Sequence, residues 1–213
     1  MPLTTLLIDL DDTVYPVESG VWQVIRRRIF LYVAEKFQVP QDEARQRCHE
    51  LFLRYGTTLR GLQVEHHIDE EEYLAFVHNV PLADLLKPDP SLRQALSALP
   101  QRKLIFTNAD AAHAQRVLAV LELEGIFEAI IDIKRMAPYC KPMPEAFAIA
   151  LRAAGVTDPT SCLLADDQPH NVRAARALGI YAVQVGAAEP DPQANASVAR
   201  LADLACVIGM AQP

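Results

Sequence analysis

Acidic residues that could hold a metal ion or carry out catalysis follow two short apolar runs of this sequence. The run at 3–9 leads into the residues DLDDT at 9–13, and the run at 161–165 is followed directly by two aspartates at 166–167. Carboxylates that are brought together repel one another and resist ionisation unless a cation lies among them. Their hard oxygen ligands favour Mg²⁺ over zinc, so the sequence predicts a magnesium site.

Groups that could bind a phosphate follow the neighbouring apolar runs. If the four aspartates Asp9, Asp11, Asp166 and Asp167 are all ionised, Lys141 and one divalent metal ion nearly balance them. A dianionic phosphate then needs further donors. The hydroxyl of Thr107, the ammonium of Lys141 and the backbone N–H groups of the turns can supply them. A helix that begins after Asp110 adds a partial positive charge at its N-terminus.

The elements that must position these groups alternate along the chain. Six short, β-rich apolar runs are separated mostly by helical patterns, and they lie at 3–9, 103–107, 129–133, 161–165, 180–185 and 205–208. Such alternation is typical of an α/β fold, a Rossmann-like three-layer core in which helices cover both faces of a mainly parallel sheet. The carboxyl ends of parallel strands share one edge, where ligands bind. The groups described above therefore meet at that edge.

Helix signals support the same interpretation. Asp110 can cap a helix through Leu121, a helix is predicted from Pro142 through Ala154, and another runs from Pro169 to Gly179. Each of these helices follows a predicted strand, as a parallel sheet requires.

The stretch between residues 15 and 87 contains no convincing strand and is too long for one crossover. Apolar residues at helical spacing predict one helix after Ser19 and a second before Gly56, and Asp69 can cap a third helix through Val77. Asp89 and Pro90 start the helix that returns to the sheet. We therefore expect a core of residues 1–14 and 88–213 that is interrupted by an all-helical cap at 15–87.

Length, charge and cysteine content narrow the classes of protein. At about 150 residues per domain, 213 residues correspond to about 1.4 domains, which fits one core with an insertion. The net charge of -7 makes a nucleic acid polymer or an anionic membrane a poor partner. The four cysteines have no metal-ligand or disulfide spacing, and no signal or membrane segment is recognisable. We therefore expect a cytoplasmic protein with reduced thiols.

Four motifs in order resemble those of the haloacid dehalogenase-like superfamily of phosphohydrolases, and the resemblance spans nearly the whole chain. They are DLDDT at 9–13, TN at 107–108, KP at 141–142 and DDQPHN at 166–171. The helical insertion after the first motif resembles that family's C1 cap. Within the chain, TVYP at 13–16, YGTTLRGL at 55–62, EHHID at 65–69 and IFTN at 105–108 are similar to the pyrimidine 5′-nucleotidase branch.

The resemblance implies a role for each motif residue. Asp9 would attack phosphorus and form an aspartyl phosphate, and Asp11 would protonate the leaving oxygen and later deprotonate the attacking water. Mg²⁺ would be held by Asp9, the backbone carbonyl of Asp11, and Asp167, with Asp166 as a further ligand or neighbour. The phosphate-binding positions implied by the resemblance are Leu10, Thr107, Asn108 and Lys141. Ala109 departs from the family pattern, where glycine is frequent, and would disfavour a positive φ.

The implied substrate is a small phosphorylated metabolite, namely a pyrimidine nucleoside 5′-monophosphate. The cap residues expected to face it are Tyr15, Tyr55, Thr57, Thr58 and Arg60. The motifs leave open a phosphatase for phosphoglycolate or a sugar phosphate, and a phosphomutase of the β-phosphoglucomutase type. A binding protein without catalysis is a further alternative, although such a protein usually lacks one of the motif residues. Nothing in the sequence indicates the oligomeric state.

Overall fold

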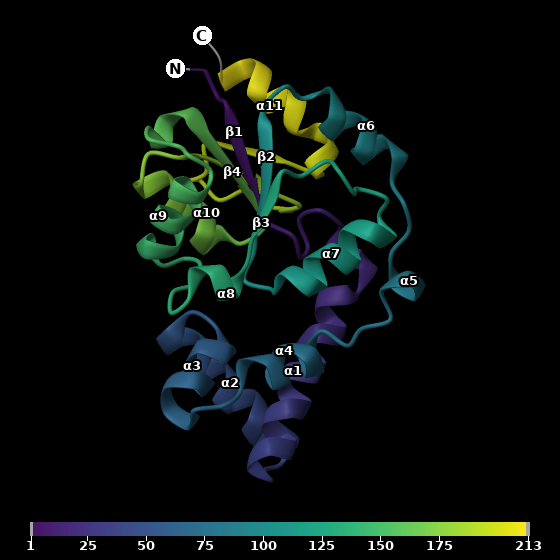
Figure 1. The fold of residues 1–213 in the computed structure, drawn as a ribbon, viewed down its shortest axis with the longest axis vertical. Helices are drawn as coiled ribbons and strands as arrows, with labels where there is room; N and C mark the ends of the chain where they lie inside the picture. Colours follow the sequence, from purple (N-terminus) through teal and green to yellow (C-terminus); the bar gives the residue numbers. More distant parts are fainter. Residues whose placement is uncertain (1, 212–213) are drawn as a thin grey trace.

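A six-stranded, entirely parallel sheet forms the centre of the molecule in the computed structural model, which describes residues 2–211 (Figure 1). Its order is β3-β2-β1-β4-β5-β6. The strands are β1 (Thr5–Ile8), β2 (Arg102–Phe106), β3 (Ala129–Ile131), β4 (Cys162–Asp166), β5 (Tyr181–Val185) and β6 (Ala196–Val198). In the central register Ile8 of β1 lies beside Ile105 of β2 and Ala165 of β4. The residues that follow these three strands therefore lie at one edge.

Helices cover both faces of the sheet, which confirms the predicted three-layer α/β fold. Along β1, Leu6 and Ile8 pack into one apolar cluster and Leu7 into the other, because successive side chains of a strand point to opposite faces. On the Leu6 face lie α6 (Pro90–Ala98), α7 (Ala111–Val120) and α11 (Leu204–Ala211). On the Leu7 face lie α8 (Ile133–Met136), α9 (Pro144–Ala153) and α10 (Pro169–Ala177).

The predicted strand at 205–208 is wrong, and the true sixth strand was missed. Residues 205–208 lie within α11, where Leu204, Val207 and Ile208 are buried at helical spacing. A short apolar run does not by itself distinguish a strand from a buried helix. The true edge strand, β6, has three residues, of which only Val198 is buried, so it carries almost no hydrophobic signal.

Helix α9 begins two residues later than predicted. Met143 precedes Pro144 and has an extended backbone (φ -62°, ψ 134°). A residue before proline is disfavoured in the helical region, so Pro144 rather than Pro142 is the first helical position.

The elements between residues 15 and 87 are all helical: a short 3₁₀ turn (Val17–Ser19), α1 (Val21–Phe37), α2 (Gln41–Tyr55), α3 (Thr58–His66), α4 (Glu70–Val77) and α5 (Leu82–Leu85). Helices α1 to α4 gather at the end of the sheet where β1 finishes (Figure 1). They share an apolar cluster that also includes Ile133 and Cys140 of the core. The boundaries of a separate cap at 15–87 stay a prediction. No helix within residues 2–211 is long and apolar enough to cross a membrane.

Helix α3, which begins within the segment YGTTLRGL, was not among the predicted helices. Thr57 caps it by accepting a hydrogen bond from the backbone N–H of Arg60. A Cβ atom added at Gly61 would lie 2.7 Å from the side chain of Leu51 on α2. Glycine weakens an isolated helix, but here it permits close contact between α2 and α3, so tertiary packing outweighs local propensity.

Candidate active site

Three carboxylates meet where β1 and β4 end. Asp9 follows β1, and Asp166 and Asp167 lie at the end of β4, which is hydrogen-bonded to β1. One oxygen from each of the three side chains lies within 4.8 Å of the others. Asp9 and Asp166 are buried and Asp167 is half-buried. This is the arrangement that the sequence predicted for the edge of a parallel sheet.

Lys141 lies between two of these carboxylates. Its Nζ donates hydrogen bonds of 2.7 Å to Asp9 Oδ1 and 2.7 Å to Asp166 Oδ2, and its side chain is buried. Burial by itself would lower the pKa of Lys141, but the two carboxylates outweigh that effect and raise it. The lysine is therefore a fixed buried cation.

One lysine does not neutralise the whole set. Burial, together with the charges of Asp166 and Asp167, raises the pKa of Asp9 against the opposing effect of Lys141. Burial and the charge of Asp166 raise the pKa of Asp167 to about 7. Three carboxylates and one ammonium leave two negative charges when all are ionised. The oxygen donors of Asp9, Asp166 and Asp167 therefore fit a hard divalent cation in both charge and chemistry.

Asp166 and Asp167 differ in how many protein donors they already meet. Asn171 Nδ2, from the first turn of α10, lies 2.9 Å from Asp166 Oδ1 and 3.1 Å from its Oδ2. The backbone N–H of Gln168 also donates to Asp166 Oδ1, at 2.9 Å. Asp167 accepts a hydrogen bond from the Gln168 side chain. Asp167 is thus freer to bind a metal directly, while Asp166 also orients Lys141.

Asp11 lies in a different environment from Asp9, although only one residue separates them. Its Oδ1 accepts hydrogen bonds from Tyr15 Oη at 2.5 Å and from His113 Nε2 at 3.1 Å. Burial would raise the pKa of Asp11, but the interactions with His113 and Tyr15 outweigh burial and lower it. Two aspartates of one loop therefore have pKa values that are shifted in opposite directions.

The predicted phosphate-binding residues surround the same edge. Thr107 is buried at the end of β2, and its Oγ1 accepts a hydrogen bond from the Ala109 N–H at 3.0 Å. Asn108 Nδ2 donates to the carbonyl of Lys141 at 3.0 Å, and Asn108 Oδ1 accepts from the Lys141 N–H at 2.9 Å. Asn108 therefore ties the Lys141 backbone to the end of β2, and Leu10 is fully buried.

Ala109 does not need the backbone freedom of glycine. The non-glycine residues with positive φ in the part of the chain that the structure describes are Asp12, Gln38, His67 and Glu122. Because Ala109 is not one of them, the departure from the family pattern at this position causes no backbone strain.

The five cap residues expected to face the substrate all have protein partners. The Tyr15 hydroxyl donates to Asp11, and the Tyr55 hydroxyl donates to Glu65 at 3.0 Å. Thr57 caps α3, and Thr58 Oγ1 donates to the Cys48 carbonyl at 3.3 Å. The buried Arg60 guanidinium donates to the carbonyls of Ile133 and Tyr139 and pairs with Glu70 at 3.1 Å, so it joins α3 to the core. Their contact with substrate stays a prediction.

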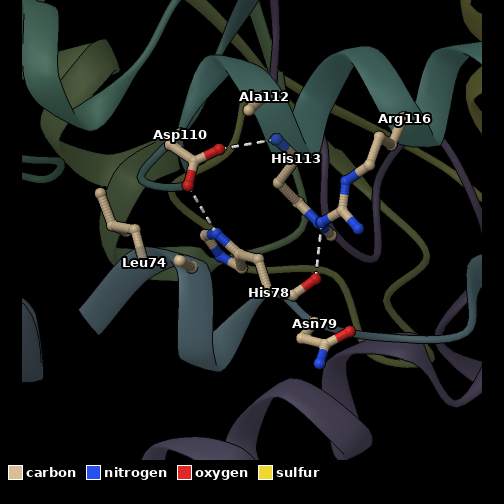
Figure 2. Close-up of a pocket in the computed structure, with 8 residues that line it drawn as sticks. Leu74, His78, Asn79, Asp110, Ala112, His113 and Arg116 are labelled. Carbon is tan, nitrogen blue, oxygen red and sulfur yellow. Dashed lines mark hydrogen bonds and ion pairs between the residues drawn. The ribbon is translucent and has the colours of Figure 1, made fainter. Parts of the chain in front are cut away.

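Sequence reasoning missed His113, which contacts Asp11, and His78, which stacks on His113. His113 lies in the first turn of α7, and His78 follows α4 of the helical insertion. Their rings stack with centroids 4.3 Å apart, and His78 Nδ1 lies 2.9 Å from Asp110 Oδ2. Both histidines line a cavity of about 270 Å³ together with Asp110 and Arg116. The residues of this cavity are drawn in Figure 2. The place of His113 just after the β2 loop was the available signal, since that loop lies at the ligand edge.

A comparison with known families identifies the family of this chain. The model of the haloacid dehalogenase-like hydrolases matches residues 3–179. The chain belongs to this family. The matched residues include Asp9, which follows β1, Asp167, which follows β4, and the helical insertion.

The individual curated relatives share less than a third of their aligned residues with this chain. The chain is 28% identical over 186 residues to phosphate metabolism protein 8 of Saccharomyces cerevisiae, an alignment that covers 81% of this chain and 58% of the yeast protein. It is 31% identical over 105 residues to fructose-1-phosphate phosphatase YqaB of Escherichia coli, which covers 49% of this chain and 55% of YqaB. The alignments thus span less than two thirds of either relative.

A solved structure supports the fold. The HAD-hydrolase YfnB from Bacillus subtilis, described as bound to magnesium, superposes with a TM-score of 0.65 at 16% identity. The match covers 98% of this chain and 99% of YfnB. At this identity, the comparison establishes that the two proteins share a fold.

Proposed function

We propose that this protein is a Mg²⁺-dependent phosphomonoester hydrolase that acts through an aspartyl phosphate on Asp9. The observation that carries the proposal is the separation of Asp9 from Asp11. Asp9 lies with Lys141 among the metal-type carboxylates, whereas Asp11 is held by His113 and Tyr15 outside that set. This arrangement supports different roles for the two aspartates, with Asp9 as the nucleophile and Asp11 as the proton-transfer group of a two-step phosphoryl transfer.

In the first step an Asp9 oxygen forms a bond to phosphorus while the bond from phosphorus to the ester oxygen breaks. The Lys141 ammonium, 2.7 Å from Asp9 Oδ1, offsets charge on the nucleophile and the phosphoryl oxygens. Thr107 and Asn108 lie at the adjacent strand end and add donors. A magnesium ion held by Asp9, Asp166 and Asp167 would supply further charge neutralisation when bound.

Asp11 moves the protons of both steps. In its protonated form it gives a proton to the departing ester oxygen, so the alcohol leaves neutral. As a carboxylate it then takes a proton from the water that attacks phosphorus, and phosphate is released as Asp9 is restored. Such proton transfer contributes about 10²–10⁴-fold to a rate. The lowered pKa of Asp11 favours the carboxylate form that the second step uses and opposes the protonated form that the first step uses.

The proposed substrate is a pyrimidine nucleoside 5′-monophosphate. The segments TVYP at 13–16 and YGTTLRGL at 55–62, which resemble the pyrimidine 5′-nucleotidase branch, support it. A sugar phosphate is the second candidate, because a fructose-1-phosphate phosphatase is among the relatives. The four cysteines are free thiols, as expected in a reducing compartment, and a cytoplasmic location is part of this proposal.

Release of phosphate tests the proposal directly. The purified protein with Mg²⁺ is incubated with UMP, CMP, dTMP, AMP, GMP, phosphoglycolate and hexose phosphates, and Asp9→Asn is the control. We expect the fastest turnover with the pyrimidine nucleotides and none with Asp9→Asn. Preference for hexose phosphates or equal turnover of purines would contradict the nucleotidase assignment. An active Asp9→Asn variant would contradict the mechanism, and tight binding of intact UMP would indicate a binding protein.

A further inference from the structure

We infer that His113 is a positioning residue that holds Asp11 in place for proton transfer, and that His78 of the helical insertion fixes the His113 ring. The inference rests on the proposed function, because it concerns the proton-transfer group of that reaction. Neither histidine belongs to the four motifs that carry the family resemblance.

The hydrogen bonds of Asp11 all end on one oxygen. Tyr15 Oη and His113 Nε2 both contact Oδ1, at 2.5 Å and 3.1 Å, and no hydrogen bond from residues 2–211 ends on Oδ2. Two hydrogen bonds to the same oxygen fix the orientation of the carboxylate. The other oxygen is then available for proton exchange with substrate and water. Proton transfer requires hydrogen-bond reach, so the orientation of this carboxylate governs its efficiency.

The unpartnered nitrogen of His113 identifies which nitrogen carries the proton. His113 is fully buried, and within the described chain its Nδ1 has no hydrogen-bond partner. A buried N–H without an acceptor is more costly than a bare ring nitrogen. The proton therefore lies on Nε2, and His113 donates to Asp11. This hydrogen bond anchors the carboxylate instead of competing with it for a proton.

His113 is held both through its backbone and through its ring. Its backbone N–H donates to Asp110 Oδ1 at 2.6 Å, and the other oxygen of Asp110 lies 2.9 Å from His78 Nδ1. The two rings stack at 18° between their planes (Figure 2). Arg116 Nη2 donates to the His78 carbonyl at 2.6 Å. Asp110 and Arg116 of the α7 region thus fix the residue that follows α4 against the core.

This arrangement connects the helical insertion to the reacting groups. His78 lies at the C-terminal end of α4, and its ring covers the face of His113, whose edge contacts Asp11. Burial lowers the pKa of His78, so the stack does not bring two cations together. Loss of the His78 ring would free the His113 ring to rotate and would loosen Asp11, although neither histidine touches the substrate.

The test compares two esters that differ in their need for a proton. The UMP leaving group is an alkoxide that must be protonated, whereas p-nitrophenolate leaves without a proton. The kcat/KM ratio of the two esters reports the bond-breaking step and does not depend on the fraction of folded enzyme. If wild type prefers another alkyl phosphate, that ester replaces UMP.

We expect His113→Met to lower kcat/KM for the alkyl phosphate about 100-fold, which is the low end of the rate loss when a proton-transfer group is removed. The kcat/KM for p-nitrophenyl phosphate should change less than about threefold. His113→Gln, which retains an N–H donor of similar reach, recovers most of the loss. His78→Leu changes the ratio in the same direction by a smaller factor. The control His49→Met, at an exposed histidine of α2, leaves the ratio unchanged.

Each other result overturns the inference in a distinguishable way. Equal losses for both esters in His113→Met, or no recovery in His113→Gln, would mean that His113 only fills space. If His113→Met does not fold, His113→Asn replaces it, because its shorter amide does not reach Asp11 and the same loss is expected. An unchanged ratio in His78→Leu refutes the role of His78. A wild type that hydrolyses neither ester, or an active Asp9→Asn, refutes the proposed function as well.

Discussion

Replacing Lys141 by methionine tests whether this residue is the internal cation of the carboxylate cluster. Methionine has a similar length and no charge, so the substitution removes the ammonium without opening a large cavity. In the native protein Lys141 Nζ lies 2.7 Å from oxygens of both Asp9 and Asp166. After the substitution, three carboxylates share the site with no positive group bonded to them.

The cost follows from the burial of these groups. Removing one partner of a buried ion pair destabilises a protein by about 3–5 kcal/mol, a large part of the about 5–15 kcal/mol that a domain possesses. Burial already raises the pKa of Asp9 while Lys141 opposes that shift, so without Lys141 this pKa rises further. When a carboxyl has a higher pKa in the folded state than in the unfolded state, the protein loses stability as pH rises from the unfolded to the folded pKa. The loss is therefore greater at pH 8 than at pH 5.5.

Urea unfolding of both proteins in EDTA, at pH 5.5 and pH 8, measures the effect. Lys36→Met is the matched control, because Lys36 pairs with Glu72 at 3.0 Å while their side chains are 39% and 53% exposed. The control should lose little stability at either pH, because an exposed ion pair contributes little. A loss in Lys141→Met of under about 1 kcal/mol at pH 8, or an equal loss at both pH values, would refute the reasoning.

Three further predictions concern other charged groups. Burial would raise the pKa of Asp110, but hydrogen bonds, with His78 foremost, lower it to about 2. The ionised Asp110 stabilises the folded protein fully above its unfolded pKa, and this stabilisation is lost as pH falls through about 2. Asp110→Asn should therefore lower the free energy of unfolding in urea by about 2 kcal/mol at pH 6 and by less towards pH 2. The pKa of Asp167 is raised to about 7, so protons compete with Mg²⁺ for this carboxylate more at pH 6 than at pH 8. A fixed Mg²⁺ concentration, 100 times the Kd at pH 8, should raise the wild-type Tm by about 5–10 °C at pH 8 and by less at pH 6. Asp167→Asn should lose most of this shift in a thermal scan. Arg60→Met should lose about 1.5–3 kcal/mol in urea unfolding, because the ion pair with Glu70 and the hydrogen bonds to the core disappear, and an unchanged stability would contradict a joining role for Arg60.

Much of the fold was predictable because its signals are local. Strands β1, β2, β4 and β5 are buried apolar runs, and α7 begins at the predicted cap, Asp110. The errors fall where local signals are weak or are outweighed by packing. Strand β6 has one buried residue, and α3 contains a glycine that only its contact with α2 explains. The short apolar run in α11 fits either period, so only its packing against the sheet decides.

The sequence by itself determined which side chains end the central strands, because a parallel sheet brings those positions to one edge whatever the details of packing. It therefore placed Asp9, Thr107 and Asp166 together and predicted the helical insertion. Only the tertiary structure decided which charged and polar side chains pair with these residues. Lys141 meets two carboxylates from 132 and 25 positions away, and Asp11 contacts His113 across 102 positions. Such partners depend on how helices pack against the sheet, and that packing arises from many weak contacts that no local pattern records.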